Sequence, residues 1–299
     1  MRKGIASIRN LAHFVFATAM LFAISMFAAP ISACGLTIIH KPIESKTDIL
    51  TIELLQLSIA NVRTDVCYQA EQHVVTDTRK TANVLSGRLS LKWGSLSKEQ
   101  MDMLKVVPIP IFKGLLGHRV LVIRKGEQLR FDNVSTLQDL QKFIAGSGKT
   151  WGDTAIFRNS GIEVVTSPRG RQLWGMLEKH RFDYLALGIY EPWEHIDAHY
   201  PQLDVENRLL IVYPMALVFY VHPENSQLYN LIKTGMDAAI KDGSYDKKLI
   251  ASRNFQIIKQ RANINQRHII RLPNPDFPSV LNAQSHKYWL DPQFFSENN

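Results

Sequence analysis

Two kinds of hydrophobic pattern alternate along the chain. Short runs rich in apolar and β-branched residues predict strands at 36–40, 89–93, 117–124, 162–165 and 182–187, and a buried strand or crossing at 209–221. Apolar residues at helical spacing predict helices over 47–63, 76–85, 135–145, 151–161, 172–180 and 226–240. Because the two kinds alternate without an internal repeat, the fold class is α/β with mostly parallel pairing.

The segment Gly146–Thr150, with the sequence GSGKT, resembles the end of a phosphate-binding P-loop. Ser135 and Gln138 form a capping box for the helix 135–145, so this segment is expected to end a helix and turn the chain. A P-loop needs a strand before it and a glycine at position 143, which is Phe143 here. The sequence therefore argues against nucleotide binding.

The first 33 residues have the layout of a secretory signal peptide. Arg2, Lys3 and Arg9 precede an apolar stretch at 11–29, and Pro30 is followed by small residues. A membrane anchor is the alternative, but the proline and small residues favour cleavage. We therefore expect an exported, periplasmic protein, whose formal charge falls from +8 to about +5 when the segment is removed. The remaining basic residues are scattered, which does not favour nucleic acid as a partner.

The two cysteines, Cys34 and Cys67, both follow the expected cleavage site. A disulfide is one interpretation, because the helix 47–63 would return the chain to the start of the strand 36–40. The other is a lipoprotein, because residues 31–34 (ISAC) resemble a lipobox, so that Cys34 would be lipidated and tether the protein to a membrane. Geometry slightly favours the disulfide.

Several segments, in this order, resemble type 2 periplasmic solute-binding proteins. The closest likeness is to a divergent subgroup of the family 3-like extracellular solute-binding proteins, the polar amino acid class. The segments are TDILTIELLQLSIA (47–60), TRKTANVLSGRLSLKWG (78–94), GHRVLVIRKGE (117–127), VSTLQDLQ (134–141), LWGMLEKHRFDYLALGIYE (173–191) and LIVYPMALVFYVHPEN (210–225). The resemblance covers roughly residues 35–250.

This resemblance implies a periplasmic binding protein type 2 fold, in which two lobes are joined by two crossings. Lobe 1 would comprise 34–120 and 218–262, lobe 2 would comprise 121–217, and 263–299 would be a tail packed on the surface. The subgroup carries an arginine before the glycine at 188, where this chain has Leu187. The polar contact that the subgroup makes at that cleft edge is therefore not expected in this chain. The identity of a ligand cannot be transferred from the subgroup either.

In lobe 1, three residues are candidate ligand contacts. The resemblance places Arg79 on the cleft-facing helix, where a guanidinium could bind a carboxylate through two hydrogen bonds, although an exposed helix arginine is an equal alternative. Trp93 and Ser95 follow a predicted strand end, which is where ligands bind in open α/β sheets. Trp93 could instead fill the core.

Lobe 2 offers four further candidates. Trp151 and Asp153 begin a predicted helix, where Asp153 could bind an amine or merely cap the helix. Tyr190 and Glu191 follow the strand 182–187 and would face the same cleft, although Glu191 also precedes Pro192 at a helix start. Both lobes would close around the ligand by hinge motion.

The sequence does not favour an enzyme, a metal protein or a cofactor. It contains no nucleophile elbow, and no carboxylate pair stands out as catalytic. His195 and His199 share a helix face, but the His-Glu-x-x-His order of zinc enzymes is absent. The main hypothesis is an exported protein that binds a small polar, amino acid-like ligand for an ABC permease. The alternative is a non-transport module that keeps the fold and signals to a membrane sensor.

Overall fold

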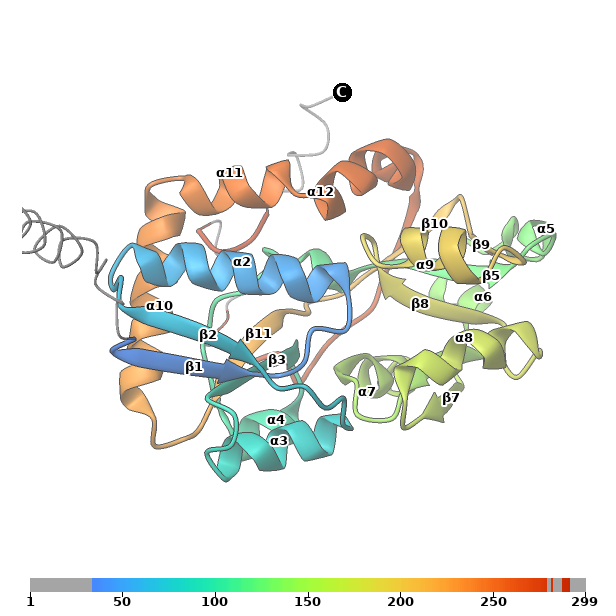
Figure 1. Cartoon of the computed structure of the whole chain (residues 1–299). Helices are drawn as coiled ribbons and strands as arrows, with labels where there is room; N and C mark the ends of the chain where they lie inside the picture. Colours follow the sequence, from blue (N-terminus) through green and yellow to red (C-terminus); the bar gives the residue numbers. More distant parts are fainter. Residues whose placement is uncertain (1–33, 279–280, 282–286, 291–299) are drawn as a thin grey trace, which may run out of the picture.

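The computed structural model describes residues 34–278, 281 and 287–290. The predicted signal peptide at 1–33 lies outside these residues. The described part forms two lobes that lie side by side, each built on its own β-sheet (Figure 1). None of the helices in the described ranges has the length and apolar character needed to cross a membrane.

Lobe 1 is built on a sheet with the described strand order β2-β1-β3-β11-β4. Its strands are β1 (Leu36–His40), β2 (Val66–Ala70), β3 (Leu91–Ser95), β4 (Lys105–Val106) and β11 (Leu217–Val221). The helices that pack on it are α2 (Lys46–Ala60), α3 (Asp77–Leu85), α4 (Lys98–Met103), α10 (Ser226–Lys241) and α11 (Ser244–Ala251). In Figure 1, α2 covers one face of the sheet, and α3 and α4 cover the other.

Lobe 2 is built on a sheet with the described order β12-β10-β5-β8-β6-β7, and β9 also pairs with β5. Its strands are β5 (His118–Arg124), β6 (Ala145–Gly148), β7 (Val164–Ser167), β8 (Tyr184–Gly188), β9 (Leu203–Val205), β10 (Leu209–Val212) and β12 (His268–Arg271). Its helices are α5 (Gln128–Phe131), α6 (Leu137–Leu140), α7 (Gly152–Asn159), α8 (Gly170–Glu178) and α9 (Pro192–His199).

Both predicted crossings between the lobes are present. The chain leaves lobe 1 after β4, passes through the short helix η2 (Leu115–Gly117) and enters β5; it returns from β10 to β11. The pairing is mixed, because β5 runs antiparallel to β8, β9 and β10, and β11 runs antiparallel to β3 and β4. The prediction of mostly parallel pairing was wrong, since strands that cross between lobes enter each sheet from its opposite end.

The segment around GSGKT also differs from the prediction. Only α6 is helical within 135–145, with Thr136 and Asp139 forming its capping box in place of Ser135 and Gln138. Ala145–Gly148 form strand β6, paired in parallel with β7 and β8. A Cβ on Gly146 would lie 2.3 Å from the Phe182 ring, so glycine lets that ring pack directly on the strand. Because residues 146–148 are themselves part of the paired strand, they do not form the loop that surrounds a phosphate in a P-loop, and Phe143 also departs from that motif.

The C-terminal part of the chain contains more regular structure than a surface tail. After α12 (Arg253–Ile257), the π-helical turn η3 (Ile258–Ala262) and the 3-10 turn η4 (Ile264–Gln266) lead into β12. This strand pairs in parallel with β10 along its four residues. The guanidinium of Arg267 is buried just before β12 and donates to the carbonyl oxygens of Glu206 and Leu209. The strand pairing thus replaces the irregular packing expected of part of 263–299.

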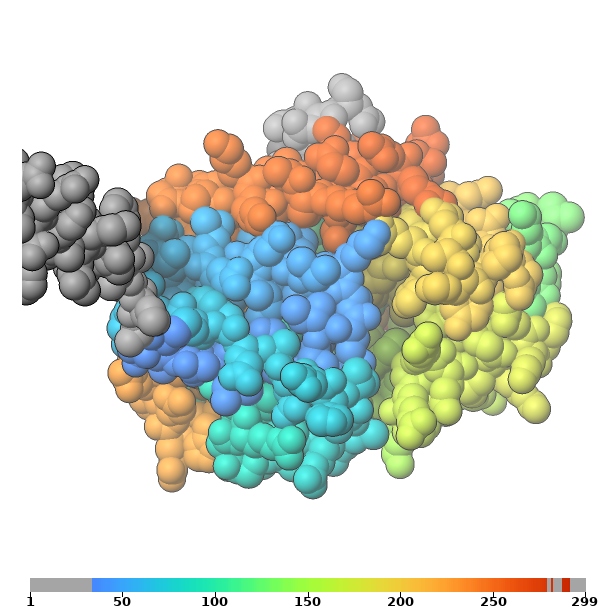
Figure 2. Space-filling model, in the orientation of Figure 1, coloured from blue at the N-terminus to red at the C-terminus, as the bar shows by residue number. Residues whose placement is uncertain are grey.

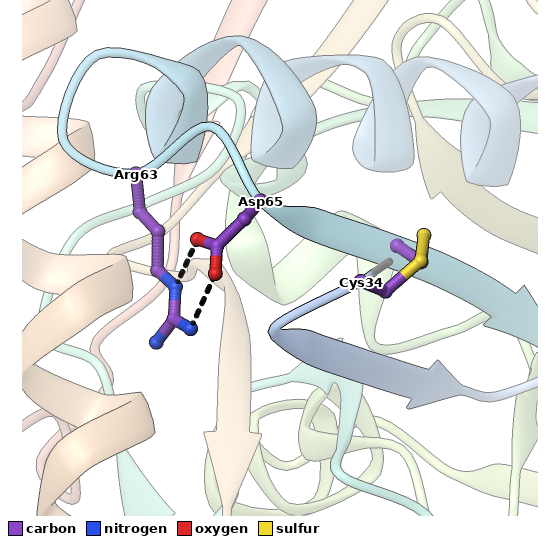
Figure 3. The surroundings of a disulfide bond; sticks show 4 residues. Cys34, Arg63 and Asp65 are labelled. Atoms are coloured by element: carbon purple, nitrogen blue, oxygen red, sulfur yellow. Dashed lines mark hydrogen bonds and ion pairs between the residues drawn. A yellow bond between two sulfur atoms is a disulfide. The ribbon is translucent and has the colours of Figure 1, made fainter. Parts of the chain in front are cut away.

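The sulfur atoms of Cys34 and Cys67 are bonded in the structure, with their Cα atoms 5.6 Å apart (Figure 3). Cys34 lies directly before β1, and Thr37 of β1 is in register with Cys67 of β2. Beside the disulfide, Arg63 forms two hydrogen bonds to the carboxylate of Asp65. A bonded Cys34 sulfur is not available for a lipid.

Candidate functional site

The lobe 1 half of the candidate site lies at the carboxyl ends of β1 and β3. Lys41 Nζ is 2.7 Å from Asp48 Oδ1 and lies 4.5 Å from the centre of the Trp93 ring. The indole nitrogen of Trp93 donates to the same Asp48 oxygen at 2.6 Å. Asp48 is in the first turn of α2, whose N-cap is Ser45. The strand ends and this helix start therefore bring a cation, a carboxylate and an aromatic ring together.

Burial and pairing act in opposite directions on this ion pair. Burial lowers the pKa of Lys41, and the neighbouring Asp48 only partly offsets the effect. Burial also opposes ionisation of Asp48, but Lys41 and the hydrogen bond from the Trp93 indole outweigh it and lower the pKa of the carboxyl group. Asp48 is therefore held as an anion within a largely dry site.

The lobe 2 half is centred on Arg119 in β5. Its Nη2 atom lies 2.6 Å from Asp153 Oδ1, at the start of α7, and both side chains are almost fully buried. The Tyr213 hydroxyl donates to the same carboxylate oxygen. Glu191 Oε2 accepts a hydrogen bond from the Gly188 backbone N–H at 2.5 Å and lies 3.6 Å from Arg119 Nη1. One guanidinium thus holds two carboxylates that come from different elements.

Pairing decides the pKa of Arg119, whereas burial decides the pKa of Glu191. Burial opposes the charge of Arg119, but Asp153 above all outweighs it and raises the pKa of the guanidinium. Burial raises the pKa of Glu191, and Arg119 offsets only part of the rise. Asp153 and Asp48 also repel the Glu191 charge, which raises this pKa further. Burial and neighbouring carboxylates thus both disfavour the anionic form of Glu191.

The two halves meet at the start of α7. The Gly152 backbone N–H points to Ser95 Oγ at 3.5 Å, and a Cβ on Gly152 would lie 2.2 Å from the carbonyl oxygen of Leu96. Asp48 of lobe 1 is close enough to act electrostatically on Tyr190 and Glu191 of lobe 2. The structure is therefore closed at this point, with lobe 2 backbone against lobe 1 backbone.

A small cavity lies beside the site. Its volume is about 10 Å³, room for about one water molecule. It is lined by Leu50 of α2, Tyr190, Phe255 of α12 and Ile258 of η3, among others. The Tyr190 hydroxyl is buried without a hydrogen-bond partner among the described residues. This cavity is too small for an amino acid.

The structure brings together five of the seven predicted ligand contacts. Trp93 and Ser95 lie at the end of β3, and Asp153, Tyr190 and Glu191 lie opposite them in lobe 2. One oxygen of Asp153, Oδ1, accepts hydrogen bonds from both Arg119 and Tyr213, so this carboxylate positions the guanidinium. Their role as ligand contacts stays a prediction.

The other two predicted contacts lie outside this group. Arg79 is exposed on α3, and no hydrogen bond or ion pair joins its side chain to another described residue. Its neighbour Lys80 is the buried cation of that helix and pairs with Glu44 at 2.5 Å. Trp151 packs its ring against Gly148 and Gly170 within lobe 2.

Sequence analysis missed Lys41, Asp48, Arg119 and Tyr213. Arg119 carried a signal, because a charged residue within the apolar run HRVLVIR has to be paired if that strand is buried. The signal for Lys41 and Asp48 was weaker: they are a basic and an acidic residue that flank the start of a predicted helix. Tyr213 lies in the crossing after β10 and has no distinguishing pattern.

The predicted histidine pair lies away from this group. His195 and His199 are exposed on α9, their ring centres 5.9 Å apart, and His195 contacts the Trp174 ring edge. Within the described ranges, no group of three or more His, Cys, Asp or Glu side chains is arranged to hold a metal ion.

No model of a protein family matches the chain, and no curated protein matches it. Solved structures with the same arrangement of elements do. Among them is AbpA, an amino acid ABC transporter substrate-binding protein from Streptococcus pneumoniae bound to L-arginine. It is 14% identical, with a TM-score of 0.57, and the match covers 75% of this chain and 96% of that one.

Two further matches are periplasmic or sensor domains. The B. pertussis BvgS periplasmic domain is 13% identical with a TM-score of 0.57, covering 72% of this chain and 42% of that one. A histidine kinase sensor domain with similarity to periplasmic binding proteins is 14% identical with a TM-score of 0.53, covering 72% and 95%. The chain therefore has the two-lobe fold of the type 2 periplasmic binding proteins, in a sequence that has diverged far from these matches.

Proposed function

We propose that this protein is an exported binding protein that closes its two lobes around a small polar, amino acid-like ligand for uptake by an ABC permease. The observation that carries the proposal is the charged group between the lobes. Lys41, Asp48 and Trp93 come from one lobe, and Arg119 and Glu191 come from the other. An ammonium and a carboxylate on one small molecule match such a set of charges.

The net charge of this group favours a ligand with a positive group. Three carboxylates, those of Asp48, Asp153 and Glu191, face the two cations Lys41 and Arg119. The raised pKa of Glu191 follows from burial and from this shortage of positive charge. An ammonium group from a ligand would relieve it by pairing with Glu191, while Arg119 or Lys41 could receive the carboxylate.

The proposed location is the periplasm, reached through cleavage of residues 1–33. The disulfide between Cys34 and Cys67 supports an oxidising compartment. No catalytic role is proposed, because the described charged groups are committed to one another and hold no activated nucleophile.

The test is a thermal-shift screen of the purified protein against amino acids and small amines. A binding protein is stabilised by its ligand in proportion to the logarithm of ligand concentration. We expect a hit whose stabilisation is lost in Glu191→Gln and kept in Lys248→Gln, which removes an exposed ion pair with Glu53. A folded protein with no hit would contradict the proposed ligand class.

A second candidate function is a signalling module with the same fold. The sensor-domain matches favour it, as does the filling of the inter-lobe site by the protein's own charges. Permease and ATPase genes beside this gene would favour transport, whereas a neighbouring sensor kinase would favour signalling.

A further inference from the structure

The C-terminal segment 253–272, here called the strap, runs from lobe 1 to lobe 2. Figure 2 shows it in orange and red, lying across the top of both lobes. It includes α12, η3, η4 and β12. It adds a connection to the two crossings, at the side of the molecule away from α3 and α7 (Figure 1).

The strap begins on lobe 1. Asn254 donates a hydrogen bond to the Thr47 hydroxyl of α2 at 3.0 Å. Phe255 and Ile258 are buried and share the small cavity with Leu50 of the same helix. This end of the strap is therefore packed into the lobe 1 side of the junction.

The strap ends in lobe 2. Strand β12 completes the edge of that sheet beside β10, and the Leu272 N–H continues the pairing to the Val212 carbonyl oxygen at 3.0 Å. Arg267 is buried at the start of the strand, where it donates to Ala262 O, Glu206 O and Leu209 O. Because backbone and side-chain hydrogen bonds both fix this end, it moves with lobe 2.

Between these ends, ion pairs join the strap and lobe 1 to α9 of lobe 2. Glu194 Oε1 accepts from Lys46 of α2 at 2.9 Å and also from Arg253 of the strap. Arg261 pairs with Asp197, and its guanidinium lies 5.0 Å from the centre of the Trp193 ring. Separating the lobes would break the pairs of Glu194 with Lys46 and Arg253, while Arg261 fastens the strap to α9.

We propose that the strap holds the lobes closed before any ligand enters, so that its release limits access to the inter-lobe site. The contacts just described join the lobes through side chains of the chain itself. Closure therefore does not require a ligand. The consequence for binding rests on the proposed function, whereas the closed resting state does not.

The proposal sets the direction in which affinity changes. A ligand that enters only the open form binds with an apparent dissociation constant equal to the intrinsic one divided by the open fraction. Loosening the strap raises that fraction, so it strengthens apparent binding. A change that merely damaged the ligand site would weaken binding.

The test measures inter-lobe distance in the full chain without ligand. Nitroxide labels are attached at Thr78→Cys on α3 and Arg169→Cys before α8, two exposed positions near the cleft side, and double electron–electron resonance gives the distance between them. We expect one narrow, short distance in the otherwise unchanged protein. The double substitution Glu194→Gln with Arg261→Gln should add a longer population.

Lys248→Gln is the matched control, because the Lys248–Glu53 pair joins α11 to α2 within lobe 1. It should leave the distance unchanged. A wild-type protein that is mostly open without ligand would overturn the proposal, as would strap variants that fold, by circular dichroism, but stay closed. Since Glu194 and Arg261 are both partly exposed, their polar replacements are compatible with folding.

A second measurement determines the affinity of the protein for any amino acid found in the thermal-shift screen. Tighter apparent binding to the Glu194→Gln, Arg261→Gln protein supports the proposal, and weaker or equal binding contradicts it. If the screen finds no amino acid, the proposed function fails while the distance measurement still decides whether the strap closes the lobes.

Discussion

Asp153 and Glu191 both lie beside Arg119, but they differ in burial, and this difference separates their roles. Asp153 is nearly fully buried and lies 2.6 Å from Arg119, whereas Glu191 is about a third exposed and lies 3.6 Å away. The Oδ1 atom of Asp153 also accepts a hydrogen bond from Tyr213, so this carboxylate is tied to two buried groups of lobe 2. Glu191 has a raised pKa because of burial and nearby carboxylates. We therefore propose a structural role for Asp153 and a ligand contact for Glu191.

Asp153→Ala should strongly destabilise the protein. The change leaves the buried guanidinium of Arg119 without its main partner, and such losses cost about 3–5 kcal/mol. The measurement is urea unfolding at pH 7. Glu53→Ala, which removes an exposed ion pair with Lys248, should cost no more than about 1 kcal/mol. Equal effects of the two substitutions would contradict the structural role of Asp153.

Glu191 should make stability fall as pH rises. Its pKa in the folded protein is raised above the ordinary value of 4.5, so the stability it contributes below that value is lost as pH rises through the folded pKa. Glu191→Gln removes this loss. In urea titrations from pH 4 to 8, the variant should gain stability relative to wild type as pH increases. A constant difference across that range would refute the raised pKa.

At the scale of elements, local pattern predicted more than long-range pairing. The strand 36–40 and the helix that begins at 77 appear as β1 and α3, because apolar spacing and a Thr76 cap identify them locally. Strand β6 was missed because its residues, AGSG, are typical of a turn and become a strand only under the rings of Phe182 and Trp151. Strand β12 was missed because its partner β10 is nearly sixty residues earlier.

The same limits explain which site residues could be found. Trp93, Tyr190 and Glu191 follow strand ends, and that position is visible in the sequence. The pairings of Lys41 with Asp48 and of Arg119 with Asp153 depend on the tertiary packing within each lobe, which local pattern does not reveal. The resemblance places Arg79 on a cleft-facing helix, but its side chain is exposed, which was the alternative interpretation.

The start of α7 lies so close to lobe 1 at Gly152 that one added methyl group there would disturb the contact. An added Cβ would lie 2.2 Å from Leu96 O and 2.9 Å from Met215 Cε, so Gly152→Ala should force the start of α7 away from lobe 1. Small-angle X-ray scattering should show a larger radius of gyration. Gly175→Ala is the control, because nothing lies within 4 Å of its added Cβ in α8, and it should gain about 0.5–1 kcal/mol. An unchanged radius in Gly152→Ala would mean that the contact does not set closure.

At the scale of the whole molecule, the two lobes, the charged group between them and the strap form one mechanism. The lobes supply opposite halves of the site, and the strap fixes how readily they separate. Lys41 is paired within lobe 1 and Arg119 within lobe 2, since buried charges need partners when no ligand is present. Ligand binding would then exchange internal pairs for pairs with the ligand.

The most direct test is a crystal structure of the protein with the best amino acid or amine from the screen. The account predicts ligand density between Trp93 and Glu191, with its ammonium group on Glu191 and polar contacts from both lobes. Density on an outer surface, or contacts from one lobe alone, would contradict the claim that the inter-lobe group is the binding site.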